Sequence, residues 1–425
     1  MADTIFALSS GAPPAAIAVV RVSGPHAGPA LVALSGRLPP PRRAVAAVLR
    51  DTGGSVLDRA LVLWLPGPRT ATGEDTAELH LHGGRAVVAA VLAVLAASPG
   101  LRAAEPGEFT RRAFANGRID LAEAEGLADL LSAETELQRQ SALAVASGAF
   151  SGQVAQWRER LLGLSAAVEA VLDFADEDDV STLPADFLQQ IDRLRADVAA
   201  WLARPRAEVL REGFRVVIAG PPNAGKSTLF NILVQSEAAI ATPIAGTTRD
   251  VLTRPVGYAG IPFLFADTAG LHDATDDVVE AIGIERALEA LDRADLVLWL
   301  GPEGQGPAGA WEIAAQCDRS DVQDKRRARH RISATTGEGI ADLIADLVET
   351  ARAALPKPGE AALNQRQHDL LREAAQALQA AEEESDPLLA AEALRLTRVN
   401  FDALLGRTTT EDMLDALFGR FCIGK

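Results

Sequence analysis

The spacing of apolar residues divides the chain into regions of strand and regions of helix. Residues 17–22, 60–65 and 77–82 are short apolar or alternating runs, a pattern that predicts strands. Between residues 122 and 210, apolar side chains recur at helical spacing with charges between them, which predicts amphipathic helices. Short apolar strands return at about residue 213 and alternate with helices until about residue 348. This alternation is typical of a parallel sheet flanked by helices.

Helical spacing returns after this block, over residues 365–396 and 411–421. Helical regions on both sides of an α/β block predict one helical domain that the α/β domain interrupts. We therefore expect a multidomain chain of the α+β and α/β classes. Its four expected segments are an N-terminal α/β domain (1–116), the first part of the helical domain (117–212), the inserted α/β domain (213–350) and the second part of the helical domain (351–425).

Charge and cysteine content narrow the choice of partners and compartment. The 425-residue chain carries a formal net charge of −17, which argues against a broad basic face for gripping RNA or DNA. Any nucleic-acid partner is therefore expected to be held by local patches or by a companion protein. The presence of only two cysteines favours a reducing cytoplasm, and the lack of a long apolar run predicts no membrane span.

Residues 220–227 read GPPNAGKS and fit the G-x-x-x-x-G-K-[ST] loop that binds phosphates. The loop follows the apolar run 214–219 and precedes a helical run, so a phosphate bound there would lie at a helix N-terminus. In such a loop the backbone N–H groups surround the α and β phosphates, Lys226 reaches the β and γ oxygens, and Ser227 holds Mg²⁺. These residues predict a nucleotide-binding domain.

Three further segments follow the loop in the order found in GTPases. The polar loop after it offers Thr248, whose hydroxyl can complete the Mg²⁺ shell. The strand 263–266 ends at Asp267, which suits a place behind the direct metal ligands, and the Gly270 amide can sense the γ-phosphate. Residues 333–337 resemble the loop that backs a guanine ring. Together these segments favour a Ras-like P-loop GTPase domain.

Two positions bear on the attacking water and on the charge of the transition state. Ras-like GTPases place a glutamine after the Asp-x-x-Gly motif to orient water, and this chain has Leu271, which cannot do so. Glu280 is the best candidate to replace it, although from the residues alone a solvated acid in a first helical turn is favoured. Asn223, inside the phosphate loop, offers an amide oxygen beside the β/γ bridge, where a monovalent cation can supply positive charge.

The segment that selects guanine is degenerate. GTPases use Asn-Lys-x-Asp after a strand such as 294–300, and the best match here is Asp318-Arg319-Ser320-Asp321. Asp321 can still accept from guanine N1 and from the exocyclic amine. Asp318 in place of asparagine loses a donor, and Arg319 replaces the lysine stem that stacks on the base. Either guanine preference is weakened or the segment aligns differently, and both interpretations stay open.

Distinctive segments lie at both ends of the chain. The last residues, 421–425, read FCIGK, and 408–412 read TTTED. The N-terminal third contains RVSG (21–24), GED (73–75), HGG (82–84), PGEFT (106–110) and AFANGRIDL (113–121). With the GTPase motifs, these segments resemble the MnmE (TrmE) family of tRNA-modification GTPases nearly from end to end.

The resemblance implies an architecture and an activity. It implies an N-terminal domain that binds folate and dimerises, followed by a helical domain interrupted by the GTPase domain. It also implies K⁺- and Mg²⁺-dependent GTP hydrolysis in a homodimer, coupled to carboxymethylaminomethyl addition at C5 of the wobble uridine of certain tRNAs. The implied partner is the flavoprotein MnmG, and the implied carbon source is formyl- or methylene-tetrahydrofolate.

The resemblance also implies roles for residues of the GTPase domain. Lys226 and Glu280 are the implied catalytic residues. The implied cation ligands are Asn223, Thr242, Ile244 and Thr247 for K⁺, and Ser227 and Thr248 for Mg²⁺. The further implied GTP contacts are Ala224, Gly225, Thr228, Gly246, Asp267, Thr268, Ala269, Gly270, Asp321, Ser333 and Ala334. His272 stands where family members commonly have arginine, and its effect on GTPase-domain pairing is open.

Residues near both chain ends fall at the family's folate and chemistry positions. Cationic side chains suit the carboxylates of a folate tail, and a carboxylate suits the pterin edge, although each residue alone is more typical of a surface ion. Cys422 is linked in the family to the modification chemistry, and a small buried apolar residue is an equally good interpretation. The family has lysine where this chain has Arg118. The residues at folate positions are Arg21, Glu78, Arg118 and Lys425.

Two other functions compete with this interpretation. A ribosome-assembly GTPase of the Era or EngA kind shares the switch motifs but carries a basic RNA-binding module, which this sequence does not offer. A catalytically weak scaffold would explain the degenerate base segment. Folate binding distinguishes the first alternative, and GTP turnover distinguishes the second.

Overall fold

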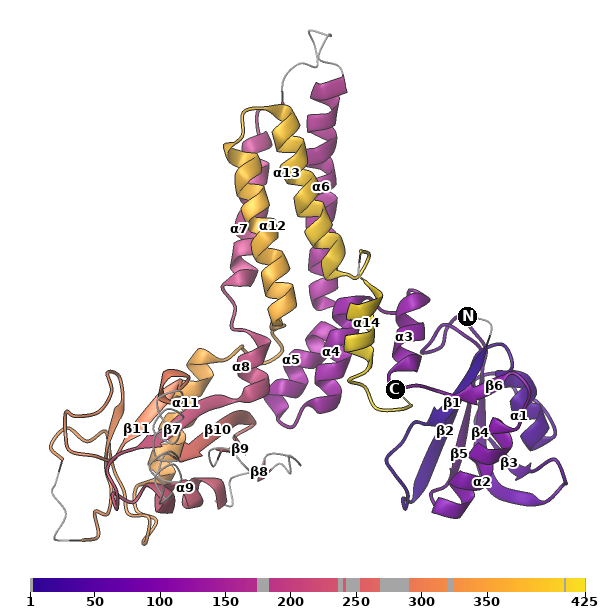
Figure 1. Ribbon diagram of the computed structural model, residues 1–425, viewed down its shortest axis with the longest axis horizontal. Coiled ribbons are helices and arrows are strands. Elements are labelled where there is room, and N and C mark those ends of the chain that lie inside the picture. The colour runs from indigo at the N-terminus through magenta and orange to yellow at the C-terminus, as the bar shows by residue number, and fades with distance from the viewer. Residues whose placement is uncertain are drawn as a thin grey trace, which may run out of the picture. The chain divides into compact units, whose positions relative to one another are not determined.

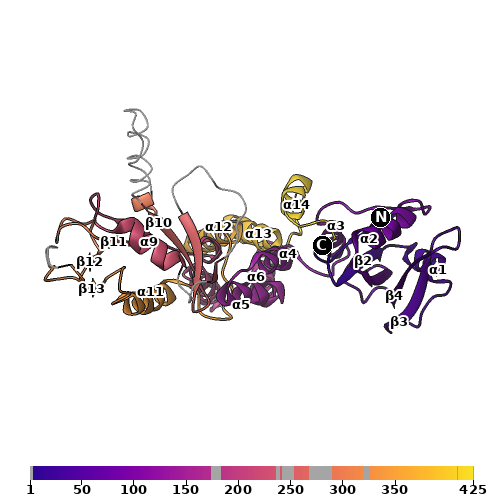
Figure 2. The same cartoon turned by 90° about the horizontal axis from the view of Figure 1, so that it is seen from below.

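The computed structural model describes residues 3–173, 183–235, 240–241, 253–267, 290–319, 325–408 and 410–424 (Figure 1). The chain divides into two compact units. Unit 1 comprises Met1–Ala128 and Asp402–Lys425, and unit 2 comprises Asp129–Phe401. Figure 2 gives a second view of the same elements. The residues discussed above that lie outside the described ranges are Thr242, Ile244, Gly246, Thr247, Thr248, Thr268, Ala269, Gly270, Leu271, His272, Glu280, Ser320, Asp321 and Lys425.

Unit 1 is built on a six-stranded sheet in the order β3-β4-β5-β2-β1-β6. Neighbouring strands are antiparallel except for the β1–β6 pair, which is parallel. The three strands expected from the alternating pattern are confirmed as β2, β4 and β5. The strands are β1 (Thr4–Leu8), β2 (Ile17–Ser23), β3 (Val45–Arg50), β4 (Val56–Leu65), β5 (Thr76–His82) and β6 (Leu101–Ala103).

The two faces of this sheet differ. Helices α1 (Ala27–Ser35) and α2 (Arg85–Ala96) cover one face and form a core with strand residues such as Val20 and Leu79. Side chains one position along the strands point to the opposite face, because the side-chain period of a strand is two. On that opposite face Ile17 is 60% exposed and Leu61 is 49% exposed, so apolar side chains remain open to solvent.

The C-terminal residues return to the N-terminal sheet within unit 1. Helices α3 (Glu108–Ala115), α4 (Leu121–Ser132) and α14 (Glu411–Phe418) share a small apolar cluster that includes Phe418 and Phe421. Beyond α14 the chain forms a β-bridge between Ile423 and Pro106. Gly424 then packs so closely that a Cβ there would lie 2.1 Å from the carbonyl oxygen of Leu8.

Unit 2 contains a seven-stranded sheet in the order β13-β12-β11-β7-β10-β9-β8. The strands from β13 to β10 are parallel, while β9 and β8 are antiparallel additions. Helices α9 (Lys226–Gln235) and α11 (Ile340–Ala354) pack into the core of this sheet. The expected parallel α/β domain is confirmed. The strands are β7 (Phe214–Ala219), β8 (Ile240–Ala241), β9 (Thr253–Tyr258), β10 (Ile261–Asp267), β11 (Leu296–Trp299), β12 (Trp311–Ala314) and β13 (His330–Arg331).

The expected alternation of strand and helix fails between β11 and β12. Residues 300–310 join these parallel strands without a helix. The segment is short for a crossover that contains a helix. This segment packs instead on the indole of Trp299. A Cβ added at Gly301 would lie 2.4 Å from the ring, and one added at Gly306 would lie 2.7 Å from it.

Helices from both sides of the α/β block lie together, as expected for an interrupted helical domain. Helices α6 (Ala149–Asp173), α7 (Phe187–Leu202), α12 (Gln365–Glu383) and α13 (Pro387–Leu404) run side by side (Figure 1), and Trp157 of α6 stacks on Phe401 of α13. None of the helices in the described ranges is long and apolar enough to cross a membrane. The four segment boundaries given above stay a prediction. The remaining helices in the described ranges are α5 (Glu136–Ala146) and α8 (Ala207–Glu212).

Candidate functional site

The phosphate loop joins the end of β7 to the start of α9, as its motif predicts. Gly220 and Gly225 have φ angles of 151° and 91°, which side chains rarely adopt. A Cβ at Gly220 would also lie 3.0 Å from the backbone nitrogen of Gly301. Asn223 adopts the left-handed region too, at φ 62°. The glycines are therefore required for the curl that turns backbone N–H groups toward a bound anion.

The side chain of Lys226 folds back onto the phosphate loop. The side chain is 4% exposed, and Nζ donates to the carbonyl oxygen of Pro221 at 2.8 Å. Burial lowers the pKa of Lys226 below its usual value, and the carboxylate of Asp267 opposes this effect. Phosphate oxygens would offer this ammonium a charged acceptor in place of a neutral carbonyl, so the residue fits the expected nucleotide.

Two residues expected at the Mg²⁺ site, Ser227 as a direct ligand and Asp267 behind the direct ligands, lie at the carboxyl edge of the sheet. Asp267 ends β10, is 1% exposed, and pairs in register with Ile218 at the end of β7. Ser227 lies exposed in the first turn of α9. A hydroxyl at the helix start and a buried carboxylate near the same ammonium are the donors that Mg²⁺ takes in such domains. The site therefore fits the metal in its two described residues.

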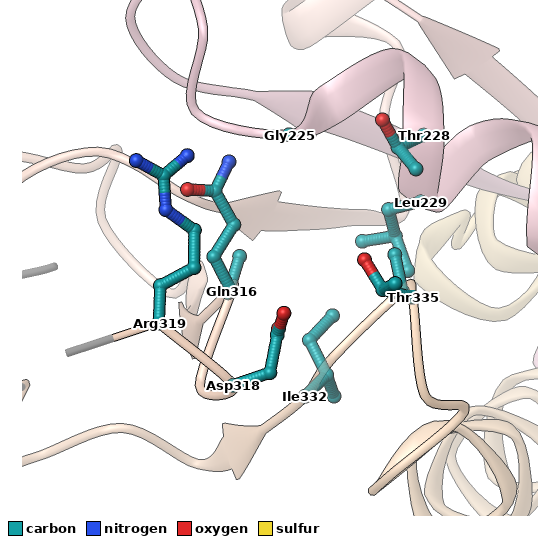
Figure 3. Close-up of a pocket in the computed structure, with 10 residues that line it drawn as sticks. Gly225, Thr228, Leu229, Gln316, Asp318, Arg319, Ile332 and Thr335 are labelled. Atoms are coloured by element: carbon teal, nitrogen blue, oxygen red, sulfur yellow. The ribbon is translucent and has the colours of Figure 1, made fainter. Parts of the chain in front are cut away.

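A cavity of about 140 Å³ lies beside the phosphate loop (Figure 3). Three segments form it: the start of α9, the residues after β12 and the residues after β13. Ala334, which was expected to contact the base, is among them. The lining residues are Gly225, Thr228, Leu229, Ala315, Gln316, Asp318, Arg319, Ile332, Ala334 and Thr335.

The carboxylate in this cavity belongs to Asp318. Strand β12 ends at Ala314, and the next residues, 315–318, run directly into the cavity. Figure 3 shows the carboxylate of Asp318 pointing into the space between Gln316 and Ile332. Counted from the strand end, Asp318 therefore takes the last position of an Asn-Lys-x-Asp loop. This is the different alignment that the sequence left open.

The loop after β13 is braced by its own hydrogen bonds. Ser333 is fully buried, its Oγ accepts from the Thr336 amide at 3.1 Å, and its amide donates to the Glu338 carbonyl at 3.0 Å. Ser333 therefore shapes the loop, while Ala334 and Thr335 line the cavity. Gln316 was not expected here, whereas Thr335 belongs to the loop 333–337 that was expected to back the base. The position of the strand end is the signal that identifies Gln316.

A second group of expected site residues lies on the open face of the unit 1 sheet. Arg21 on β2 and Glu78 on β5 are paired in register and joined by a salt bridge of 2.9 Å. The guanidinium of Arg21 lies 5.8 Å from the centre of the Phe109 ring. His80 Nε2 lies 3.4 Å from Glu78 Oε2. Cation, carboxylate and aromatic ring are thus close together on this face.

The C-terminal tail reaches the end of strand β1. Arg21 pairs across β1 with Ala7, whose neighbour Leu8 contacts Gly424. Cys422 is exposed, so it is not the buried packing residue that the sequence allowed. Arg118 is exposed as well. Its side chain lies so close to Gly73 that a Cβ added to that glycine would be 3.2 Å from the Cγ of Arg118. The salt-bridged pair Arg21 and Glu78 therefore lies on β2 and β5, and the C-terminal tail lies against the end of the adjacent strand β1.

Two family models match most of the chain. The model described as "GTP-binding protein TrmE N-terminus" matches residues 4–118, and the model described as "MnmE helical domain" matches residues 121–422.

Curated relatives match over their whole length. A tRNA modification GTPase MnmE of Novosphingobium aromaticivorans is 63% identical over 437 residues, covering 100% of both chains. The protein of the same name from Erythrobacter litoralis is 63% identical over 423 residues, again covering 100% of both. That from Rhizorhabdus wittichii is 58% identical and covers 100% of this chain and 97% of its own.

Two solved structures are similar to part of this chain. The G domain of the T. maritima FeoB iron transporter is 22% identical, covers 32% of this chain and 98% of its own, and gives a TM-score of 0.23. Era in complex with MgGDPNP and a fragment of 16S ribosomal RNA is 22% identical, covers 41% and 69%, and gives a TM-score of 0.25. Both TM-scores are low.

Proposed function

Because the chain belongs to the MnmE family of tRNA modification GTPases, we propose that its GTP hydrolysis requires K⁺ and Mg²⁺ and drives carboxymethylaminomethyl addition at C5 of the tRNA wobble uridine. The observation that carries the proposal is the phosphate loop, in which a buried Lys226 lies beside a cavity that contains one carboxylate. Its action on tRNA suggests the cytoplasm as its site of work.

The phosphate end of GTP is assigned to the loop and its neighbours. Lys226 exchanges the Pro221 carbonyl for the β and γ oxygens, a charge-assisted contact. Ser227 and Thr248 would hold Mg²⁺, with Asp267 behind them. Bound Mg²⁺ supplies positive charge to the β and γ oxygens. The burial of Lys226 and Asp267 supports this assignment, because charges act more strongly where water is excluded.

The base end of GTP is assigned to Asp318. A carboxylate accepts two hydrogen bonds from guanine, one from N1–H and one from the exocyclic amine, and adenine offers no such pair. Asp318 in the cavity beside Gly225 supports the assignment, with Ala334 and Thr335 also lining this cavity. Asp321 is the alternative reader of the base.

The hydrolytic step is assigned to a cation and an acid. Asn223 would hold K⁺ together with Thr242, Ile244 and Thr247, and its exposed position within the phosphate loop supports this. Glu280 would orient water, because Leu271 cannot.

The open face of the unit 1 sheet is assigned to a second copy of the chain. Exposed apolar side chains on one sheet face are typical of an interface. Ile17, Val48 and Leu61 are exposed on this face, which supports a homodimer formed through unit 1.

Folate and the partner protein complete the proposal. Arg21, Glu78, Arg118 and Lys425 would bind formyl- or methylene-tetrahydrofolate on the same face, with Cys422 exposed nearby. The net charge of −17 supports a division of labour in which the flavoprotein MnmG supplies much of the grip on tRNA.

Family membership decides between the functions considered. The family models cover the N-terminal and helical regions, where a ribosome-assembly GTPase of the Era or EngA kind has other modules. The relatives are GTPases by name, which argues against a scaffold without turnover.

Steady-state hydrolysis of GTP and ATP by the purified chain, in KCl and then in NaCl, tests the proposal. We expect GTP turnover in KCl only, no ATP turnover, and loss of turnover in Lys226→Ala. Equal rates in both salts would remove the K⁺ assignment of Asn223, and equal use of ATP would remove the base assignment.

A further inference from the structure

One side chain links the base cavity to the phosphate loop. The amide Nε2 of Gln316 donates to the carbonyl oxygen of Asn223 at 3.3 Å. The same nitrogen would lie 3.3 Å from a Cβ at Gly225, so the side chain lies across the outer surface of the loop. Figure 3 shows the amide end of Gln316 directed toward Gly225.

The backbone at both ends of this contact is unusual. Gln316 has φ 58° and Asn223 has φ 62°. Left-handed backbone at residues other than glycine costs free energy and persists where surrounding contacts maintain it. The contact between these two residues is such a restraint, because it holds one strained residue against the other.

The chemistry of Gln316 differs from that of the usual residue at its place. With Asp318 reading the base, Gln316 takes the lysine position of Asn-Lys-x-Asp, and Ala315 takes the asparagine position. A glutamine keeps a donor and an aliphatic stem but adds no charge. The contact between the two loops is therefore a neutral hydrogen bond.

We propose that Gln316 is a positioning residue that couples base binding to the K⁺ site by holding the Asn223 carbonyl. The inference rests on the proposed function of Asn223. When the base occupies the cavity, Gln316 is held beside it, and the backbone that presents the Asn223 side chain is held with it. Loss of the donor frees both loops, so nucleotide affinity and K⁺ affinity fall together.

The test compares Gln316→Met, which keeps the stem and removes the donor, with Gln316→Lys, which keeps stem and donor. Two quantities are measured: GDP affinity in NaCl, and the K⁺ concentration for half-maximal GTP hydrolysis. A neutral hydrogen bond contributes about 1 kcal/mol, so we expect Gln316→Met to change each quantity about three- to tenfold. The rate at saturating K⁺ stays within about twofold of wild type, and Gln316→Lys restores both quantities. Gln379→Met, on the exposed face of α12, is the matched control and leaves both unchanged.

The possible results separate this inference from the function on which it rests. If Gln316→Met binds GDP as wild type does, or if Gln316→Lys behaves like Gln316→Met, the role of the donor is refuted. If GDP affinity falls but the K⁺ requirement does not move, the coupling is refuted. A wild-type rate that is equal in KCl and NaCl would instead refute the K⁺ proposal itself, and the GDP affinities would still decide whether Gln316 supports the base loop.

Discussion

At the scale of single residues, the phosphate loop was predictable and the base loop was not. The letters of residues 220–227 are enough to predict the strand, loop and helix order found at β7 and α9. Ala315 and Gln316 replace the recognisable Asn-Lys of the base loop, so the sequence analysis placed the base-reading carboxylate at the later Asp321. The end of β12 at Ala314 instead supports the register in which Asp318 takes that position.

Replacement of Asp318 tests the base assignment. In Asp318→Asn, one of the two acceptors becomes an amide donor that opposes the exocyclic amine of guanine, while the remaining oxygen still accepts from N1–H. Two charge-assisted hydrogen bonds contribute about 1.5–3 kcal/mol each, so we expect GDP affinity to fall about 100-fold or more. Xanthosine diphosphate has a carbonyl oxygen in place of that amine, so we expect Asp318→Asn to bind it more tightly than the wild-type protein does. Calorimetric titration measures both.

Asp321→Asn is the control for that experiment. We expect it to bind GDP as wild type does. The reverse outcome, with Asp321→Asn impaired and Asp318→Asn unaffected, would restore the alignment in which Asp321 reads the base.

At the scale of elements, period and spacing predicted strands β2, β4, β5, β7, β10 and β11 and the long helices. Strands such as β1, β3 and β6, and several contacts between residues distant in sequence, were not predicted. The helix expected between β11 and β12 is replaced by packing of Gly301 and Gly306 on Trp299. The bridge between Pro106 and Ile423 joins opposite ends of the chain. No local pattern predicts such a contact, because residue propensities describe only neighbours in sequence.

The C-terminal tail depends on close packing of Gly424 against strand β1. Gly424 has φ 94°, and a Cβ would lie 2.1 Å from the Leu8 carbonyl oxygen, so Gly424→Ala must displace the tail. We expect formyl-tetrahydrofolate affinity to fall about tenfold or more, the result of misplacing one charged contact. GTP hydrolysis should stay at the wild-type rate. Unchanged folate affinity, measured by fluorescence titration, would place the folate site elsewhere.

Helix α3 is attached to the sheet by a buried ionic network. Arg112, 1% exposed, donates to Asp3, Glu74 and Glu108. Burial raises the pKa of Glu108, but hydrogen bonds from Arg102, the Glu105 amide and Arg112 outweigh it, so the pKa lies below its usual 4.5.

A depressed carboxyl pKa makes stability depend on pH. The stabilisation from Glu108 is complete above about pH 4.5 and is lost as pH falls through the lower pKa of the folded state. We expect urea unfolding of unit 1, monitored by hydrogen exchange, to show this loss of stability at low pH in the wild type. The loss should be smaller in Glu108→Gln. Glu392→Gln, from an exposed pair, should retain the wild-type pH dependence. Equal pH profiles for wild type and Glu108→Gln would show that the network does not stabilise α3.

At the scale of the whole molecule, the interrupted helical domain was predicted from helical spacing on both sides of the α/β block. The open sheet face was only partly predictable. Alternation predicts two faces for β2, β4 and β5, but the pattern does not say that α1 and α2 pack on the same face.

The exposed face predicts the oligomeric state. Leu61→Asp places a charge in the proposed interface, where burial without a partner is costly, so we expect a dimeric wild type and a monomeric variant by light scattering. Leu188→Asp, exposed on α7, is the control and should stay dimeric. A monomeric wild type, or a dimeric Leu61→Asp, would contradict the assignment of this face.

The coupling of GTP hydrolysis to tRNA modification is the central claim, and nucleoside mass spectrometry tests it most directly. The chain is expressed in bacteria that lack their own MnmE but retain MnmG, and wobble uridines are analysed. We predict that carboxymethylaminomethyluridine returns with the wild-type chain and not with Lys226→Ala. Unmodified uridine in the presence of a chain that hydrolyses GTP would contradict the account.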